Sequence, residues 1–237
     1  MLAKMIDKIV GLKQTQIFDI GGQTYTDGDL ERVPPHVDRP ERMSVSGLDS
    51  VCKLIRTELK KIGTVIMVQV DSYKSVSVTT TYLADYSRNT LYRAESDVPG
   101  FRPGWHDRED AVIELRSMFI PNDGTAYLLD LLSKITDTSS ETIKDNGVTQ
   151  VVEATSGIAL KASVEIKPRV SLCPFRTFLE VEQPESEFVL RVDADRGIGL
   201  FEADGGVWKL EAKRNIVKYF EDNLKDLVEA GNVVVMC

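Results

Sequence analysis

The sequence of 237 residues has few of the side chains that most often carry chemistry. It contains two histidines, His36 and His106, and three cysteines, Cys52, Cys173 and Cys237, with no C-x-x-C pair. Such widely spaced cysteines predict neither a zinc knuckle nor a redox motif, and they favour reduced thiols in a cytoplasmic compartment. Nucleophile-elbow, H-E-x-x-H and Walker A motifs are also missing from the sequence. We therefore predict that the protein is not an enzyme and binds no cofactor.

Long apolar runs are missing as well. No run approaches the roughly 20 residues of a membrane-spanning helix, and residues 1–14 mix charges with short apolar groups, unlike a signal peptide. We expect no membrane association and a cytoplasmic location. Hydrophobic residues make up 42% of the chain and charged residues 28%, which is typical of globular proteins, so a folded core is expected.

Positive charge is outnumbered and unevenly placed. The chain has 29 basic and 37 acidic side chains, a net charge of −8. Residues 1–100 carry 13 of each, so residues 101–237 hold the whole net charge. This balance argues against a constitutive coat on duplex DNA, which needs many cations to replace counterions. A partner of the acidic half is expected to be basic or another copy of the chain, although an acidic surface also serves solubility alone.

The N-terminal half alternates helical and strand patterns. We expect residues 1–42 to hold a short helix over 2–10, a β-hairpin around Gly21-Gly22 and an extended proline-rich arm. Residues 43–136 read as an α+β subdomain. Its expected elements are a helix from Ser46 or Gly47 to about Ile62, strands Thr64–Asp71, Lys74–Leu83 and Asn89–Glu95, and two helices that follow Asp107 and Pro121.

The C-terminal part, residues 137–237, reads as an antiparallel β-sheet subdomain with a C-terminal helix and strand. The candidate strands are Val148–Ala154, Ile158–Ile166, Phe175–Glu182, Glu187–Asp193, Ile198–Ala203 and Val207–Leu210. Short turns and alternating apolar and charged residues favour a meander. A helix over about Glu211–Glu229 and the strand Asn232–Met236 follow. The predicted class is therefore α+β, with a mixed helix/sheet N-terminal half and an antiparallel β-meander C-terminal half closed by a helix.

Two stretches are candidates for binding. The final strand contains Val233, Val234, Val235 and Met236; it either completes the chain's own sheet, which we favour, or adds to a neighbour's sheet edge as an oligomer contact. The predicted helix before Gly63 carries four cations off its apolar face, namely Lys53, Arg56, Lys60 and Lys61.

These cations admit two interpretations. The favoured one is a solvated helix flank with positive charge near its C-terminus. The alternative is a site for single-stranded nucleic acid, in which tyrosines nearby in the sequence serve as stacking platforms. Those tyrosines are Tyr73, Tyr82, Tyr86 and Tyr92.

An acidic pair also has two interpretations. Glu202 and Asp204 would share a strand face and bind a divalent metal with ligands from elsewhere, but Asp-Gly-Gly is also the chemistry of a tight turn, which we favour. Arg176 lies among bulky apolar residues, where an arginine is usually paired with a carboxylate. Glu202 and Asp204 are its candidate partners.

Several segments resemble one family. They are GGQTYTDGDLERVPP (21–35), MSVSGLDSVCKLI (43–55), DNGVTQVVEATSGIAL (145–160), LCPFRTFLEVEQPESEFVLRV (172–192) and LFEADGGVWKLEA (200–212). Through the sequences of these segments, the chain resembles the YfdQ-like family of uncharacterised bacteriophage and prophage proteins over nearly its whole length. The resemblance carries no activity or catalytic residue. It implies a phage or prophage origin, expression in a bacterial cytoplasm, and a part in phage DNA metabolism or in countering the host.

The expected function is that of a non-enzymatic phage accessory protein that assembles into a homo-oligomer and binds through its surface. A host or phage protein is the expected type of further partner. Two alternatives stay open: a single-stranded nucleic-acid-binding module, and a metal-dependent enzyme that uses the acidic pair.

Overall fold

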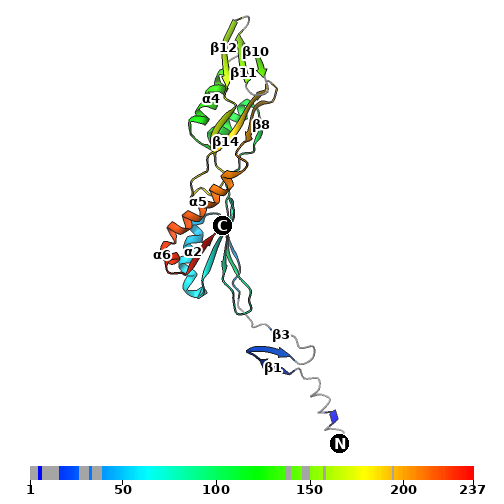
Figure 1. The fold of residues 1–237 in the computed structure, drawn as a ribbon, viewed down its shortest axis with the longest axis vertical. Coiled ribbons are helices and arrows are strands. Elements are labelled where there is room, and N and C mark those ends of the chain that lie inside the picture. Colours follow the sequence, from blue (N-terminus) through cyan, green and yellow to red (C-terminus); the bar gives the residue numbers. More distant parts are fainter. Residues whose placement is uncertain are drawn as a thin grey trace.

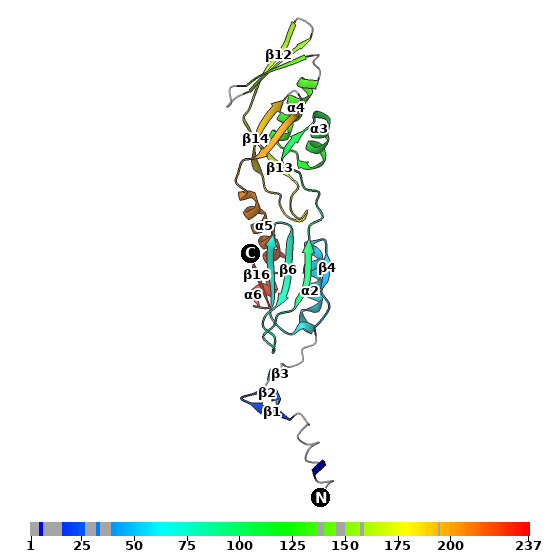
Figure 2. The same ribbon diagram turned by 90° about the vertical axis from the view of Figure 1, so that its right-hand side faces the viewer.

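The computed structural model describes residues 5–6, 16–26, 32–33, 39–136, 140–145, 150–156, 159–193 and 195–237. Most of them form two lobes stacked end to end in an elongated molecule (Figures 1 and 2). We call the lobe that carries the C-terminus the lower lobe, and the other one the upper lobe. Each lobe has its own sheet and its own apolar core.

The lower lobe is a two-layer sandwich of one sheet and three helices. Its strands lie in the order β16-β5-β6-β7-β4; they are β4 (Met43–Val45), β5 (Ile66–Ser72), β6 (Ser75–Thr80), β7 (Thr90–Glu95) and β16 (Val233–Met236). The edge strands β16 and β4 run parallel to their neighbours, whereas the three central strands are antiparallel. The helices α2 (Leu48–Ile62), α5 (Val207–Asn223) and α6 (Lys225–Glu229) lie on one face of the sheet (Figure 1).

Helix α2 shows how the sequence builds this lobe. Its buried residues Leu48, Val51, Cys52 and Ile55 recur at helical spacing, so one face packs against the sheet. Gly63 ends the helix in the left-handed region (φ 66°), and its N–H donates to the Leu59 carbonyl at 3.1 Å. The expected helix is thereby confirmed.

The upper lobe is built around a second, antiparallel sheet. Its strands lie in the order β8-β15-β14-β13-β9; they are β8 (Gly104–His106), β9 (Phe119–Ile120), β13 (Arg169–Pro174), β14 (Ser186–Asp193) and β15 (Gly197–Glu202). Helices α3 (Arg108–Ser117) and α4 (Asp123–Thr136) contribute to its core. The Asp107 carboxylate accepts the N–H of Asp110 at 2.9 Å, which confirms the expected N-cap of α3.

Two small sheets extend from the ends of the molecule. Strands β10 (Ser140–Asp145), β11 (Gln150–Ser156) and β12 (Ala159–Ile166) form an antiparallel sheet beyond the upper lobe. Strands β1 (Ile17–Ile20), β2 (Gln23–Thr26) and β3 (Arg32–Val33) form another beyond the lower lobe (Figure 2). Gly21 and Gly22 (φ 59° and 77°) make the expected hairpin turn between β1 and β2.

The helix expected over residues 2–10 lies outside the described residues, except for Met5 and Ile6, which are helical. Much of the expected extended arm, at residues 27–31 and 34–38, also lies outside them. Of the segment assigned to residues 1–42, the hairpin is the expected element that falls within the described residues, which also include strand β3 and residues 39–42.

The α+β class and the antiparallel C-terminal sheet are confirmed, but the two cores divide the chain differently from the expected segments. Ile216 and Phe220 of α5 and Val233 of β16 belong to the lower core, together with Val51 and Ile55 of α2. The C-terminal helix therefore packs on the sheet formed by the N-terminal half. Because β8 and β9 join the C-terminal strands, the upper lobe is inserted in the chain between β7 and α5.

Two expected strands are corrected by the structure. Residues 175–182, whose apolar and acidic side chains alternate, are an irregular loop, and residues 207–210 form the first turn of α5. The alternation misleads because Phe178 and Val181 are buried in the lower core whereas Leu179 is 69% exposed. The burial follows the path of a loop between two lobes instead of the pleat of a strand.

Candidate functional site: the cleft between the lobes

The loop between β13 and β14 joins the two lobes, and we call residues 175–185 the junction loop. It leaves the upper sheet, inserts Phe178 and Val181 into the lower core, and returns. The Thr177 hydroxyl donates to the Tyr73 carbonyl of the lower lobe at 2.5 Å. The junction loop thus ties the lobes together through apolar and polar contacts.

Gln183 organises this loop from within. Its side chain is buried, its Oε1 accepts the N–H groups of Arg176 (2.9 Å) and Thr177 (3.1 Å), and its Nε2 donates to the carbonyls of Phe178 (2.8 Å) and Val181 (3.2 Å). One amide therefore satisfies four backbone groups of a loop that has no strand partner. Since unpaired buried backbone groups are costly, Gln183 makes the irregular path stable.

Glu180 connects the junction loop to α2. Its Oε1 accepts the N–H of Leu48 at 2.8 Å, so its carboxylate lies at the N-terminus of the helix, where a negative charge is favourable. Gly47 leaves room for this contact, because a Cβ at that position would lie 2.7 Å from the same oxygen.

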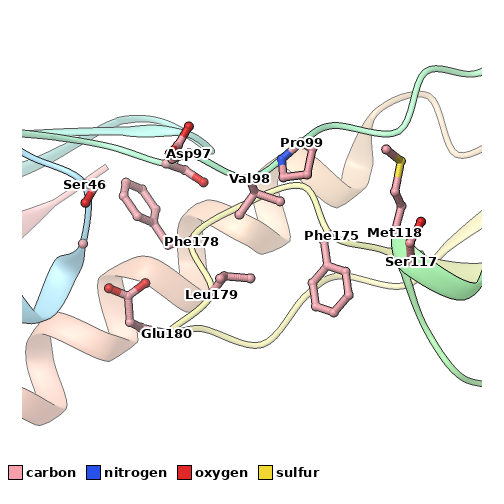
Figure 3. A pocket seen from close by; sticks show the side chains of 12 residues that line it. Ser46, Asp97, Val98, Pro99, Ser117, Met118, Phe175, Phe178, Leu179 and Glu180 are labelled. Carbon is pink, nitrogen blue, oxygen red and sulfur yellow. The ribbon is translucent and has the colours of Figure 1, made fainter. Parts of the chain in front are cut away.

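A cleft of about 560 Å³ opens beside these contacts (Figure 3). Its apolar wall comes from both lobes and from the segment that crosses between them, with Val98, Pro99, Met118, Phe175 and Leu179 as its main members. In Figure 3 Leu179 lies between Phe178 and Phe175, below Val98. The cleft therefore offers a continuous apolar surface at the junction.

The polar groups of the cleft are few. Ser46 and Asp97 lie toward the lower lobe and Ser117 toward the upper one (Figure 3), and the remaining charge is that of Glu180. The described lining residues include two carboxylates and no lysine, arginine or histidine. With its apolar walls and two carboxylates, the cleft suits binding of an apolar segment that carries positive charge.

The cations predicted on α2 lie where expected, but one of them has a structural role. Lys53, Lys60 and Lys61 are exposed. Arg56 pairs with Asp226 of α6 and donates to the Asn223 carbonyl, both at 2.7 Å. Arg56 therefore joins α2 to the helices at the C-terminus.

The tyrosines near these cations are dispersed. Tyr92 is buried and donates to Glu58 at 2.5 Å, and Tyr73 packs edge-on against Trp208 at 4.7 Å between ring centroids. Tyr82 and Tyr86 are 66% and 69% exposed in the turn between β6 and β7. Two of the four tyrosines therefore have exposed side chains.

The acidic pair has protein partners. Arg176 donates to Glu202 at 3.1 Å, which confirms the expected ion pair. Asp204 accepts the N–H groups of Gly206 (2.9 Å) and Trp208 (3.3 Å) at the start of α5. Across the described parts of the chain, no three His, Cys, Asp or Glu side chains gather as metal ligands. This geometry favours structural roles for Glu202 and Asp204.

Strand β16 completes the chain's own sheet, as favoured from the sequence. It pairs in parallel with β5, from Val233 opposite Ile66 to Met236 opposite Gln69. Val233 is buried, whereas Val234 and Met236 are 42% and 37% exposed. Its outer edge pairs with none of the described strands.

The sequence pattern revealed neither the junction loop nor the contact between His106 and Glu114 in the upper lobe. His106 Nδ1 lies 2.8 Å from Glu114 Oε2, and its ring stacks on Phe101 at 5.0 Å between centroids. His106 is one of the two histidines in the sequence, but its partner Glu114, eight residues later, is apparent only from the structure. The only sign of the junction loop was Pro174 and Pro184 at its two ends.

Comparisons with known proteins provide no further assignment. No family model, curated protein or solved structure matches the chain. No helix in the described ranges has the length and apolar character needed to cross a membrane. Function has to be inferred from the surfaces described above.

Proposed function

We propose that this protein is a non-enzymatic phage or prophage accessory protein that works in the bacterial cytoplasm by homo-oligomeric assembly and surface binding. The resemblance to the YfdQ-like family supports the phage origin and a part in phage DNA metabolism or against host defence. The observation that carries the assembly is the exposed apolar hairpin β1–β2.

This hairpin has no core of its own. Ile17, Phe18 and Ile20 are 69%, 42% and 59% exposed, and both views show the small sheet apart from the lobes (Figures 1 and 2). Strands of four residues with apolar side chains exposed on both faces are at best marginally stable in water. Exposed apolar side chains gathered in one element mark an interaction site, so a second chain is the natural cover.

The inter-lobe cleft of a second copy is the proposed receiving surface. Residues 1–20 combine apolar side chains with three lysines, Lys4, Lys8 and Lys13, against two aspartates. The cleft combines apolar walls with Asp97 and Glu180. Donor and acceptor are thus complementary both in apolar character and in charge.

Native mass spectrometry and light scattering across protein concentrations test the assembly. The full chain is expected to form a discrete oligomer, and the double variant Ile17→Ser/Ile20→Ser and the single variant Leu179→Asp are each expected to shift it toward monomer. Ile113→Ser, which alters a 58% exposed residue on α3, is the matched control and should assemble normally. A full chain that stays monomeric at every concentration refutes the proposal.

Further variants test which surface of the second copy receives the hairpin. Asp97→Lys is expected to weaken the oligomer, and combining it with Lys8→Glu is expected to restore part of the lost affinity. If Val234→Lys disrupts the oligomer and Leu179→Asp does not, the β16 edge and not the cleft receives the hairpin.

A second candidate function, binding of single-stranded nucleic acid, is favoured by the turn between β6 and β7. Tyr82 and Tyr86 are both exposed there, and the guanidinium of Arg88 lies 4.4 Å from the centroid of the Tyr82 ring. Exposed aromatic rings beside cations are stacking platforms for bases. Fluorescence anisotropy with single- and double-stranded DNA across salt concentrations checks it, because binding of this kind must weaken as salt rises.

A further inference from the structure

A second, smaller cavity is lined by cationic side chains and aromatic rings. It has a volume of about 240 Å³ and lies between Tyr73 and Lys74 of the lower lobe and Arg176, Trp208 and Lys209 near the start of α5. The chain as a whole is acidic, with a net charge of −8. A concentration of positive charge in such a chain needs a physical explanation.

Arg176 is the innermost of these cations. It is 4% exposed, donates to Glu202 (3.1 Å), the Pro184 carbonyl (3.1 Å) and Ser186 Oγ (2.7 Å), and lies 3.8 Å over the Trp208 ring. Burial lowers the pKa of Arg176, and the nearby Glu202 carboxylate opposes that shift. An arginine nevertheless stays charged in this setting, so a permanent positive charge lies at the cavity.

The polar groups left without partners here are donors. Arg176 Nε and Trp208 Nε1 are buried and find no acceptor among the described residues. Buried donors of this kind are rare in folded proteins and often indicate a bound ligand or water. What they lack is an acceptor, which is what an anion supplies.

Two lysines add mobile charge at the same place. Lys209 Nζ lies 5.6 Å from the centroid of the Trp208 ring, and Lys74 Nζ makes a long 3.4 Å contact with the Val98 carbonyl. Glu202 is the one carboxylate among the described lining residues, and it is already engaged by Arg176. The lining therefore carries three cations against one anion, and both lysines can turn toward a ligand.

We infer that this cavity binds a small anion, through a phosphate or carboxylate group held by Lys74 and Lys209 above the buried guanidinium of Arg176. The volume of about 240 Å³ limits the ligand to a small molecule. Because Tyr73 and Lys74 belong to the lower lobe and Arg176 follows the upper sheet, such a ligand bridges the lobes and stabilises the junction. This site is separate from the inter-lobe cleft and does not depend on the proposed assembly.

Thermal unfolding and isothermal titration calorimetry of the full chain test the site. The probes are inorganic phosphate and citrate, compared with sodium chloride at matched ionic strength. The melting temperature is expected to rise by about 5 °C or more when the concentration of the binding anion is on the order of a hundred times its dissociation constant. A response to phosphate alone, to citrate alone or to both identifies the accepted group, and no response beyond chloride to either refutes the inference.

Matched variants locate the binding. Lys74→Gln/Lys209→Gln is expected to weaken the affinity at least ten-fold, because it removes both movable cations and leaves Arg176 in place. Lys218→Gln is the control: it removes one positive charge from an exposed position on the same helix α5, outside the cavity. This variant should bind the anion as the wild type does. Equal affinity in the double variant and the wild type refutes the assignment to this cavity.

Discussion

The Glu180 carboxylate accepts a hydrogen bond from the backbone N–H of Leu48, 132 residues earlier in the chain, at 2.8 Å. One residue belongs to the loop between two strands of the upper sheet, and the other begins the main helix of the lower lobe. A helix cap is usually provided by a residue next to the helix in sequence. Here it comes from the junction loop, so the start of α2 and the position of the upper lobe are set by the same contact.

Loss of this cap should destabilise the lower lobe. Glu180→Ala is expected to lower the free energy of unfolding by about 1 kcal/mol, since that is the usual cost of removing an N-cap acceptor. Urea unfolding followed by circular dichroism measures it. Glu182→Ala, at an exposed position two residues later, is the control and should change little; equal losses in both variants would show that Glu180 does not act as a cap.

Gln183 should be far more sensitive than its position in a loop implies. Gln183→Met keeps the size of the side chain but removes the side-chain partner of four backbone groups, of which, within the described residues, only the Phe178 carbonyl keeps another donor, the N–H of Val181 at 3.4 Å. We therefore expect a loss of about 3 kcal/mol or more. The same substitution at Gln69, exposed on β5, should cost less than about 0.5 kcal/mol. Denaturant unfolding of both variants compares the two, and similar stabilities would contradict the role assigned to Gln183.

The three thiols should differ in reactivity. Burial, aided by Asp49, raises the pKa of Cys52 to about 11, and burial also raises the pKa of Cys173. At pH 8 both are protonated and inaccessible, whereas Cys237 is exposed. Ellman's reagent should therefore titrate one thiol quickly in the native protein and three after unfolding; fast loss of two or more native thiols would be inconsistent with this core.

The raised pKa of Cys52 also determines how the free energy of unfolding changes with pH. The unfolded thiol loses its proton near its ordinary pKa of 9.0, and the folded one only near 11. The folded state thus holds the proton more tightly, and its stability is expected to fall as the pH rises from 9 toward 11. Cys52→Ala should reduce this alkaline loss, measured as the slope of the unfolding free energy against pH.

Asp85 should titrate at unusually low pH. Hydrogen bonds from the hydroxyl and the N–H of Ser87, assisted by Arg39, lower the pKa of Asp85 to about 2. Its contribution to folding is present above pH 3.8, the ordinary value, and is lost as the pH falls toward 2. Carboxyl NMR titration should show the pKa of Asp85 rising in Ser87→Ala, while Thr57→Ala, which alters a distant hydroxyl on α2, leaves it unchanged.

A substitution at Tyr86 should have opposite effects on stability and on nucleic-acid binding. It is a non-glycine residue in the left-handed region (φ 61°), a conformation that costs roughly 1 kcal/mol for residues with a Cβ. Tyr86→Gly is therefore expected to raise the free energy of unfolding by about 1 kcal/mol. If the turn binds single-stranded nucleic acid, the same variant should lose affinity, whereas Tyr82→Gly should lose affinity without gaining stability.

Local patterns predicted much of the fold. The apolar spacing from Leu48 to Ile55 and the glycine at position 63 located α2, and Asp107 located the start of α3. These features depend on contacts within a few residues. The packing of α5 beneath the N-terminal sheet could not be predicted in the same way, because Ile216 and Phe220 are equally suited to either core by composition alone.

The site was predictable only in part. A carboxylate partner for Arg176, with Glu202 and Asp204 as the candidates, followed from the rarity of an unpaired arginine among apolar neighbours, and the structure shows that Glu202 is the partner. The cleft did not follow, since it arises where segments more than a hundred residues apart meet. The role of Gln183 did not follow either, because its backbone partners lie in a nearby loop of irregular path that no periodic pattern marks. A glutamine before a proline carries no local sign that it will bind four backbone groups.

The insertion of the upper lobe also has a consequence for biosynthesis. The lower lobe begins with β4 and is finished only by β16 at the other end of the chain. At 5–20 residues per second, the ribosome needs on the order of ten seconds to produce the intervening segment. During that interval the upper lobe can fold as a unit, while α2 and the four strands β4 to β7 still lack α5 over their apolar face. The part of the protein that is synthesised first is therefore the part that matures last.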